Sequence, residues 1–384
     1  MMMPEERAVP VDIKAWIGAT FVPAWAAAVV DPQTPGFVEW MRPDFTPVPG
    51  EKRTTLVTAR LIHVFSHAHC LDPAGPGLAA ARHGLDFLLN VCRGPDGRFR
   101  HAVTVSGAVL DARSDLYDLA FVLFGLGWYA RASGDRSVLA VADAVAGFID
   151  AELADAAGGF AEDTLGTLPR RQNPHMHLLE AFLLLAEVAP GGGWGRRAEA
   201  MVALFRSHLF DAETGSLGEF FDIRWQPAPG AAGTLREPGH HFEWCWLLHQ
   251  HARLTGDATV LDLADRLFDF GCAHGLEPHH PRGAALDEVD RAGRVVRPTK
   301  LLWPQTELLK AVVARREFGR GKPTDPAAAD VLGIIFGHYV DAATGRWLNQ
   351  LDAAGEPVTA DVPVRVLYHL MFALAEYARA GAGA

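Results

Sequence analysis

The sequence lacks the features that mark membrane, secreted or nucleic-acid-binding proteins. No apolar run approaches 18 residues, so no transmembrane helix is expected. The N-terminal segment MMMPEERAVP is acidic and polar rather than basic and then apolar, so we expect no secretory signal. The net charge of −11 leaves no basic excess to displace counterions from a nucleic acid or to bind an anionic membrane. We therefore expect no nucleic-acid partner and no membrane partner.

Cysteine is scarce as well, with 4 residues in 384 and no Cys-x-x-Cys pair. Each cysteine falls within an apolar helical pattern, which predicts reduced, mostly buried thiols in a cytoplasmic protein. There is no His-Glu-x-x-His zinc motif and no GxGxxG or Walker loop. HAHC at 67–70 has the residue types of a zinc site, but positions i and i+2 point to different faces of a helix. The sequence therefore predicts no metal and no cofactor.

Hydrophobic residues, in contrast, make up 49% of the chain, enough for a large core. They recur mostly at i, i+3, i+4 and i+7, which is the period of a helix, and strand signals are scarce. We expect an all-α protein. Its twelve predicted helices begin near residues 11, 53, 76, 114, 136, 174, 196, 240, 257, 303, 325 and 364.

The connections between these helices alternate in length. Short turns such as ASGD (132–135) and LTGD (254–257) follow every second helix, and longer loops follow the others. In the longer loops, Asp and Gly supply turn chemistry before an apolar residue. The six segments are DPQTPGF (31–37), PDGRF (95–99), DAAGGF (155–160), DAETGSL (211–217), DRAGRVV (290–296) and DAATGRW (341–347).

A helical hairpin of about 60 residues thus recurs six times, and such self-similarity decides the architecture. Six antiparallel hairpins can close into a toroid, an (α/α)6 barrel, which we expect to be a single domain over residues 1–384. The helices that begin near 53, 114, 174, 240, 303 and 364 would line its inside. Their N-termini follow the long loops, so a pocket is expected at that end.

The inner helices begin with polar and aromatic segments. Each repeat supplies one chemically active group to the same end of the toroid, at spacings of 58, 59, 63, 63 and 66 residues. Convergence of histidines, an arginine and carboxylates on one hollow is the general form of an enzyme pocket. The six groups are Arg60, Asp118, His177, His240, Trp303 and His369.

Several residues of these segments also have structural explanations. Trp303 and Phe121 can be packing residues or an aromatic floor for a sugar ring. Within the histidine pairs 175/177 and 240/241, we expect only one member of each pair to face inward. A carboxylate near a helix N-terminus can simply stabilise the helix dipole, which applies to Asp118, Glu180, Glu243 and Glu307.

The same segments resemble those of the N-acylglucosamine 2-epimerase superfamily, which includes mannose isomerases and cellobiose 2-epimerases. They occur in the family's order over most of the chain, and the family fold is an (α/α)6 barrel. The matching segments are TAR (58–60), YDLAF (117–121), NPHMHLLEA (173–181), PGHHFEW (238–244), LWPQTE (302–307) and YHL (368–370). Leu119 departs from the histidine that many isomerases carry in the second segment, which affects substrate contacts there.

The resemblance implies a role for each matching residue. His240 and His369 would be the acid/base groups at sugar C2, and His177 would act in ring opening with contacts to O1 and O5. Arg60 would stabilise the enediolate, and Glu243 would orient or tune a catalytic histidine. The remaining positions imply substrate contacts, namely Tyr117, Asp118, Phe121, Asn173, Trp303, Gln305 and Glu307.

The chemistry agrees with these residue types. A neutral imidazole can take and return the weakly acidic proton beside a carbonyl group, and a guanidinium keeps its charge next to an anionic oxygen. The resemblance of the HMHLLEA (175–181) and LWPQTE (302–307) segments implies an aldose–ketose isomerase that interconverts D-mannose and D-fructose, or a related aldose such as lyxose, through a cis-enediolate. The expected partner is a monosaccharide, and a homodimer through the outer helices stays open.

Other functions also stay open. Return of the proton to the opposite face of C2 would make the protein a sugar 2-epimerase. Arg113, Arg170 and Arg171 lie near the pocket entrance and could hold a phosphate, as in a mannose-6-phosphate isomerase. Asp118 with Glu243 or Glu307 would suit a glycoside hydrolase, and helical repeats also serve as interaction scaffolds. A glycoside hydrolase would leave the three inner histidines without a purpose, and loss of turnover in His369→Ala would exclude a scaffold.

Overall fold

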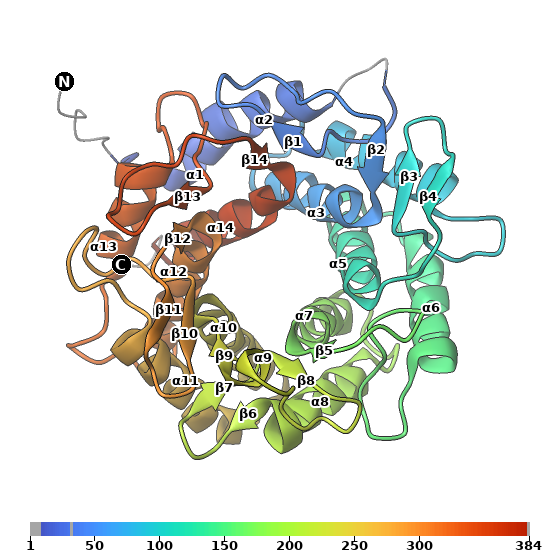
Figure 1. The fold of residues 1–384 in the computed structure, drawn as a ribbon. Helices are drawn as coiled ribbons and strands as arrows, with labels where there is room; N and C mark the ends of the chain where they lie inside the picture. Colours follow the sequence, from blue (N-terminus) through green and yellow to red (C-terminus); the bar gives the residue numbers. More distant parts are fainter. Residues whose placement is uncertain (1–8, 31–33, 382–384) are drawn as a thin grey trace.

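The structure, a computed structural model, describes residues 9–30 and 34–381. The N-terminal eight residues and residues 31–33 of the first predicted turn lie outside the described residues. The chain is mostly helical, as expected, and its longest helices form an inner ring (Figure 1). Each inner helix contacts the next one along the chain, and α14 contacts α3, so the ring closes. The inner helices are α3 (Thr55–Leu71), α5 (Leu116–Ser133), α7 (Gln172–Val188), α10 (Pro238–Thr255), α12 (Leu302–Glu317) and α14 (Leu367–Gly381).

A second set of helices surrounds this ring and alternates with it along the chain (Figure 1). Five of these outer helices in the described residues contain a five-residue π-helical segment, which widens one turn. In order, the outer helices are α1 (Ile13–Trp16) with η1 (Ile17–Phe21) and α2 (Val22–Val29), α4 (Gly77–Phe87) with η2 (Leu88–Cys92), α6 (Val138–Phe148) with η3 (Ile149–Leu153), α8 (Trp194–Leu204) with η4 (Phe205–Leu209), the 3-10 turn η5 (Ala258–Val260) with α11 (Leu261–His274), and α13 (Ala328–Ile334) with η6 (Ile335–Tyr339).

Local signals fix where the inner helices begin and end. Thr54 accepts a hydrogen bond from the Val57 N–H at 3.2 Å and caps α3, and the Asp115 carboxylate caps α5 in the same way. The short turns end α5 and α10 at Gly134 and Gly256, whose φ values of 74° and 78° are left-handed. The inner helices are buried on almost every side. Each inner helix follows one of the long loops, so the N-termini of the inner helices lie beside these loops at one end of the ring.

The loops at that end contain short strands that the sequence analysis did not foresee. Strands of two or three residues present no periodic signal, and each is held by pairing with a distant loop. The strand β1 pairs with β14, which joins the first long loop to the last. In the described residues the strands are β1 (Trp40–Met41), β2 (Lys52–Thr54), β3 (Ala102–Thr104), β4 (Val109–Asp111), β5 (Arg170–Arg171), β6 (Phe210–Asp211), β7 (Ser216–Leu217), β8 (Phe220–Phe221), β9 (Leu235–Arg236), β10 (Glu288–Asp290), β11 (Val295–Arg297), β12 (Lys300–Leu301), β13 (Gln350–Leu351) and β14 (Val362–Pro363). Two short helical turns, α9 (Ala231–Thr234) and η7 (Val364–Val366), complete these loops.

The predicted turn signal has a structural counterpart. After an outer helix, an antiparallel bridge joins the helix end to the apolar residue of the signal, as between Ala154 and Phe160 and between Val340 and Trp347. The fifth signal, DRAGRVV (290–296), was matched wrongly. The bridge of that repeat joins Leu276 to Ala285, and 290–296 instead forms the turn between β10 and β11. Asp and Gly suit any tight turn, so they did not distinguish the loop after the outer helix from the turn between β10 and β11.

The cysteines only partly match their predicted burial. All four are free; Cys92 and Cys245 are buried and Cys272 is half-buried, whereas Cys70 is exposed at the end of α3. In the part of the chain that the structure describes, no helix combines the length and apolar character needed to cross a membrane.

Candidate active site

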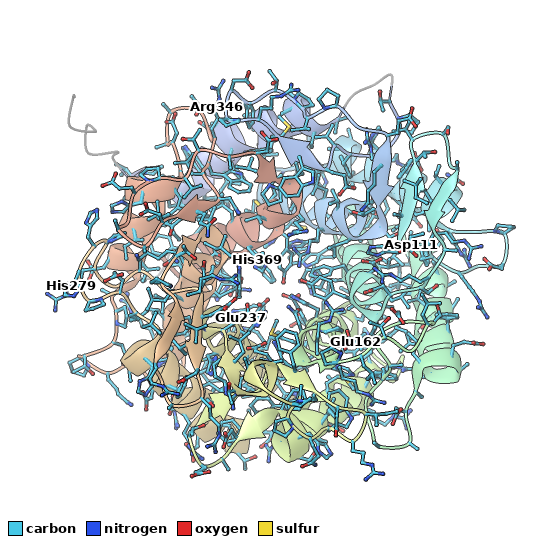
Figure 2. All side chains as sticks on the ribbon, viewed as in Figure 1. Asp111, Glu162, Glu237, His279, Arg346 and His369 are labelled. Carbon is cyan, nitrogen blue, oxygen red and sulfur yellow. The ribbon has the colours of Figure 1, made fainter. Side chains whose placement is uncertain are left out.

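A cavity of about 690 Å³ opens where the inner helices begin. Its size is within the range of small-molecule sites. In Figure 2, His369 and Glu237 lie toward the centre of the ring, whereas His279 lies at its outer edge. The six groups predicted from the repeat spacing all line the cavity, one from each inner helix: Arg60, Asp118, His177, His240, Trp303 and His369.

His369 lies in the first turn of α14, with its ring held by a buried carboxylate. Its Nδ1 is 2.8 Å from Oε1 of Glu307, which is fully buried. Burial, together with the positive charges of Arg60 and Lys310, lowers the pKa of His369 well below its usual value. The ring is therefore neutral. Because Nδ1–H donates to Glu307, the lone pair lies on Nε2, so His369 is a base that faces the cavity.

His240 has the opposite charge state. Its Nδ1 lies 2.9 Å from Oε2 of Glu219 and 3.7 Å from Oε2 of Glu237. Burial alone would lower the pKa of His240, but these two carboxylates outweigh burial and raise it to about 10. The side-chain amide of Asn173 lies 3.0 Å from Nε2. The atom placed there is the amide nitrogen Nδ2, so an imidazolium, which donates from both nitrogens, requires the Asn173 amide to turn its oxygen toward Nε2. His240 is therefore an acid.

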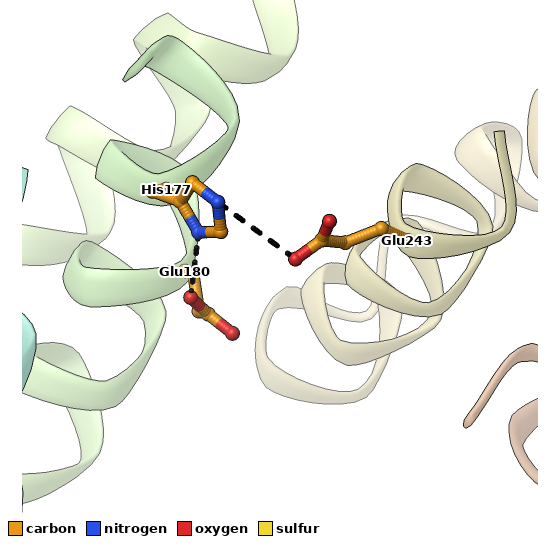
Figure 3. A group of neighbouring side chains, drawn as sticks. All are labelled: His177, Glu180 and Glu243. Atoms are coloured by element: carbon orange, nitrogen blue, oxygen red, sulfur yellow. Dashed lines mark hydrogen bonds and ion pairs between the residues drawn. The ribbon is translucent and has the colours of Figure 1, made fainter. Parts of the chain in front are cut away.

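His177 is a second neutral histidine (Figure 3). Its Nδ1 lies 3.0 Å from Oε2 of Glu180, and the same oxygen accepts a hydrogen bond from the Tyr368 hydroxyl at 2.6 Å. Burial, and then the charge of Arg60, lowers the pKa of His177 well below its usual value. Its Nε2 lies 3.9 Å from Oε1 of Glu243. His177 therefore turns an unprotonated nitrogen toward Glu243 and the cavity.

The family resemblance implied that Glu243 orients or tunes a catalytic histidine. In the structure, Glu243 makes no hydrogen bond that could orient one. Both its carboxyl oxygens are buried and without a hydrogen-bond partner among the described residues. Burial and repulsion from Glu307 raise the pKa of Glu243 well above its usual value. It lines the cavity, and its raised pKa favours the protonated carboxyl, which can donate a proton. In its ionised form, Glu243 adds to the negative charge that raises the pKa of His240, after the larger effects of Glu219 and Glu237.

Arg60 lies on the cavity wall and is held in place by three neighbours. Its Nη2 donates to the Tyr117 hydroxyl at 2.6 Å, and its Nη1 donates to the backbone oxygen of Arg365 at 3.2 Å. The guanidinium lies 4.1 Å from the ring centre of Phe121, a cation–π distance. A held guanidinium with unused N–H groups is suited to an oxygen that becomes negative during a reaction.

Trp303 lies beside both acid/base candidates. Its ring centre is 4.9 Å from that of His240 and 5.6 Å from that of His369. Gly239 makes this position available, because a Cβ there would lie 2.5 Å from the Trp303 ring. The indole therefore offers a flat apolar surface between the two histidines, as a sugar ring requires.

Three residues predicted to contact substrate do not line the cavity. Gln305 is fully buried, and its side-chain oxygen accepts the Ala285 N–H at 2.6 Å, so it holds a loop. Glu307 and Phe121 each lie one helical turn further along than Trp303 and Tyr117. Glu307 contacts His369 and Lys310. Phe121 packs against Tyr117 and the guanidinium of Arg60. These three predictions are corrected to supporting positions. Tyr117, Asp118 and Asn173 do line the cavity.

Other residues of the site come from the loops and escaped the sequence analysis. Glu219, between β7 and β8, lies 21 residues before the His240 that it binds, so no local spacing connects them. His101, just before β3, has Nδ1 2.7 Å from Oδ2 of Asp118. Burial raises the pKa of Asp118 to about 6. A single sequence offers no signal for such pairings between loops and helices.

Of the three arginines considered for a phosphate, two reach the cavity. Arg113 and Arg171 line it, and Arg171 is paired at 2.6 Å with Glu162. Arg170 lies outside it, paired with Asp155. Arg365 also lines the mouth, with an exposed side chain. The wall also contains Arg60, the cationic His240 and six carboxyl groups, those of Asp115, Asp118, Glu162, Asp163, Glu237 and Glu243.

Three groups of side chains bring histidine nitrogens and carboxylate oxygens within 4.8 Å of one another. They are His177, Glu180 and Glu243; Glu219, Glu237 and His240; and Glu243, Glu307 and His369. In each group, the Nδ1 of the histidine is already hydrogen-bonded to a carboxylate. We therefore describe them as histidine–carboxylate pairs and assign no metal ligands.

Replacing Glu219 with glutamine is expected to lower the pKa of His240 from about 10, because the amide removes the negative charge beside Nδ1. The unfolded value is 6.5, so the contribution of His240 to the free energy of unfolding is complete below pH 6.5 and is lost as pH rises toward 10. NMR titration of His240, with unfolding at pH 6 and pH 9, measures both effects. An unchanged pKa in the Glu219→Gln variant would contradict the assigned ion pair.

Comparisons with known proteins agree with this geometry. The sequence model of the N-acylglucosamine 2-epimerase family matches residues 36–373. A mannose-6-phosphate isomerase of Rhizobium meliloti (strain 1021) is 31% identical over 372 residues, which is 95% of each chain. A D-mannose isomerase of Thermobifida fusca is 28% identical over 360 residues, or 86% of this chain and 85% of its own. The cellobiose 2-epimerase structure from Spirochaeta thermophila DSM 6192 shares the fold, with a TM-score of 0.83, 24% identity and coverage of 96% of this chain and 95% of that one.

Proposed function

Because the chain belongs to the N-acylglucosamine 2-epimerase family, we propose that it is an aldose–ketose isomerase that interconverts free D-mannose and D-fructose. Relatives named as isomerases and epimerases of sugars support an enzyme that acts on a sugar. We assign its fold to the (α/α)6 barrel, as a single domain. The alternation of inner and outer helices and the contact of α14 with α3 support this assignment.

We favour isomerisation over epimerisation because His369 and His240 differ in charge. His369 is neutral and turns Nε2 to the cavity, so it can remove a proton from C2 and return it to C1 on the same face. Epimerisation needs a second group to deliver a proton to the opposite face of C2. His240 holds such a proton, but its Nε2 lies 3.0 Å from the side-chain amide of Asn173, which competes with the sugar for that nitrogen. The geometry therefore favours transfer by one base.

Ring opening comes first, because the pyranose hides the carbonyl group. His177 can take the proton of the O1 hydroxyl at Nε2, while the neutral carboxyl of Glu243 gives a proton to O5 as the C1–O5 bond breaks. The two groups lie 3.9 Å apart, so the proton can pass back between them before ring closure. General acid–base catalysis of this kind typically contributes about 10²–10⁴-fold.

Isomerisation follows on the open chain. Nε2 of His369 takes the C2 proton, and the electrons move toward the C1 carbonyl oxygen to give a cis-enediolate. Arg60 stabilises the negative oxygen, and the imidazolium of His240 offers a second positive charge. The O2 hydroxyl proton passes to O1, which the neutral Nε2 of His177 can relay, and return of the proton from His369 to C1 then gives the ketose. Trp303 holds the carbon chain between the two histidines.

The test is to incubate the protein with D-mannose and separate the products by chromatography over time. We expect D-fructose as the first and main product, with D-glucose formed much more slowly. Glucose as the main early product would overturn isomerisation and make the protein a 2-epimerase. Release of reducing sugar from an oligosaccharide, without either product, would instead indicate a glycoside hydrolase.

A phosphorylated sugar is the second candidate, because Arg365 is exposed at the mouth and a 31% identical relative is named a mannose-6-phosphate isomerase. At the mouth, Arg171 is already paired with Glu162 and Arg113 with Asp163, and these carboxylates oppose a dianion, because juxtaposed like charges cost several kcal/mol. We therefore expect kcat/KM for mannose to exceed that for mannose 6-phosphate by roughly tenfold or more. Arg365→Met should leave the mannose value nearly unchanged. A preference for the phosphate that Arg365→Met abolishes would reverse the choice.

A further inference from the structure

Lys310 is a buried cation that the reaction steps above do not use. It lies on α12, one turn after Glu307, and its side chain is fully buried. It is not among the residues that line the catalytic cavity. An ammonium group inside a protein is costly unless other charges compensate it. Its position therefore requires an explanation.

Two kinds of neighbour compensate the charge of Lys310. Its Nζ lies 2.7 Å from Oε2 of Glu307, an ion pair between two fully buried groups. On its other sides, Nζ lies 4.4 Å from the ring centre of Trp246 and 4.7 Å from that of Phe372. Aromatic faces attract a cation but leave it poorly hydrated. The carboxylate of Glu307 is therefore its main partner.

Charged and titratable groups reach this pair from several inner helices. Glu243 and His240 approach from α10, Glu180 and His177 from α7, Tyr368 and His369 from α14, and Arg60 and His63 from α3. Burial opposes the charge of Lys310, but Glu307, Glu243 and Glu180 raise its pKa above its usual value. Burial also raises the pKa of Glu307, and Lys310 is the strongest opposing influence. The charge of Lys310 thus favours an ionised Glu307.

Glu307 connects Lys310 to the catalytic base. Its Oε2 faces Lys310, and its Oε1 lies 2.8 Å from Nδ1 of His369. An ionised carboxylate can only accept, so it keeps the imidazole proton on Nδ1 and the lone pair on Nε2. A protonated carboxyl can donate to Nδ1 instead, which places the imidazole proton on Nε2. In that tautomer, His369 presents no base to the cavity.

We propose that Lys310 is a positioning residue for proton transfer: by keeping Glu307 ionised, it holds His369 in the tautomer whose Nε2 can take the sugar proton. The activity part of this proposal depends on the proposed isomerase function. The tautomer part does not, because the arrangement of Lys310, Glu307 and His369 exists without substrate.

The test is the Lys310→Met variant, which keeps the length and apolar stem of the side chain and removes its charge. At pH 7, kcat should fall by about 10- to 100-fold, the effect of losing part of a general base. KM should change little, because Lys310 does not line the cavity. Activity should recover as pH rises, because Glu307 then ionises without help. The acidic limb of the kcat profile should move up by more than one pH unit.

The double variant Lys310→Met/Glu307→Gln is the matched control. Its glutamine cannot ionise, so the alkaline recovery should disappear while the packing around position 310 stays the same. If Lys310 serves only packing, Lys310→Met will lower activity equally at all pH values, and the proposal is then wrong. Where methionine prevents folding, Lys310→Gln gives the same comparison.

A second measurement does not depend on turnover. The ¹⁵N chemical shifts of His369 report which ring nitrogen carries the proton. We expect the proton on Nδ1 in the unaltered protein at pH 7 and on Nε2 in Lys310→Met. Identical shifts in both proteins would overturn the proposal even if mannose is a substrate. The expected change in a protein that does not turn over mannose would keep the proposal and reject the function.

Discussion

Replacement of His369 with asparagine is expected to lower kcat for mannose by about 10²–10⁴-fold, the usual contribution of a positioned general base. Asparagine can still donate a hydrogen bond to Glu307, so the packing of α14 is retained while Nε2 is lost. KM should change much less than kcat, because Trp303 and the other walls of the cavity remain. Initial rates of fructose formation from mannose, over a range of concentrations, measure both parameters.

The matched control for this change is His279→Asn. His279 is exposed at the outer edge of the ring, so its loss should leave kcat within experimental error of the unaltered protein. A His369→Asn variant that folds normally and keeps more than a tenth of the original kcat would contradict the assignment of His369 as the base. It would transfer that role to His177, the other neutral histidine of the cavity.

Replacement of Arg60 with methionine should have the second-largest effect, a loss of about 10²–10³-fold in kcat. The guanidinium is expected to bind the enediolate oxygen more strongly than the uncharged carbonyl oxygen, so its loss raises the barrier rather than only weakening binding. Methionine keeps an apolar contact with Phe121, and Tyr117 loses its donor. Steady-state kinetics with mannose, and equally with fructose, measure the loss in both directions.

Two further variants distinguish the charge of Arg60 from its shape. Arg60→Lys keeps the charge but not the planar donors, and should recover only part of the rate. Arg346→Met removes an exposed arginine far from the cavity and should have no effect on kcat. A loss confined to KM in Arg60→Met would mean that Arg60 only binds the sugar. Stabilisation of the anion would then have to come from His240.

The helical repeat and the inward-facing residues could be predicted from the sequence because both depend on local periodicity. An inner helix turns the same face to the cavity in each hairpin, so a spacing near 60 residues brings Arg60, His177 and His369 to one end. How far a residue lies from the cavity along its helix was harder to predict. Glu307 is four residues after Trp303 and on the same side of α12, but about 6 Å further along the helix. It therefore lies below the cavity rather than in it.

The remaining errors come from contacts that no short segment contains. Gln305 follows Trp303 by two residues, so it points to another side of α12, and a helical projection could have shown this. Glu219, the partner of His240, could not have been found from the geometry of a helix. Glu219 reaches it only because β7 and β8 place their loop over α10, and two-residue strands depend on pairing with distant segments. One sequence without relatives cannot reveal such pairs.

The common direction of the inner helices has a consequence for the reaction as a whole. In the described structure, all six begin at the catalytic cavity, and each helix start carries roughly half a positive elementary charge from its peptide groups. These partial charges surround the place where the proposed enediolate would form, and the protein interior screens them little. The backbone itself thus creates an electric field that favours the anion over the neutral sugar. Part of the rate acceleration should therefore survive the loss of any one side chain.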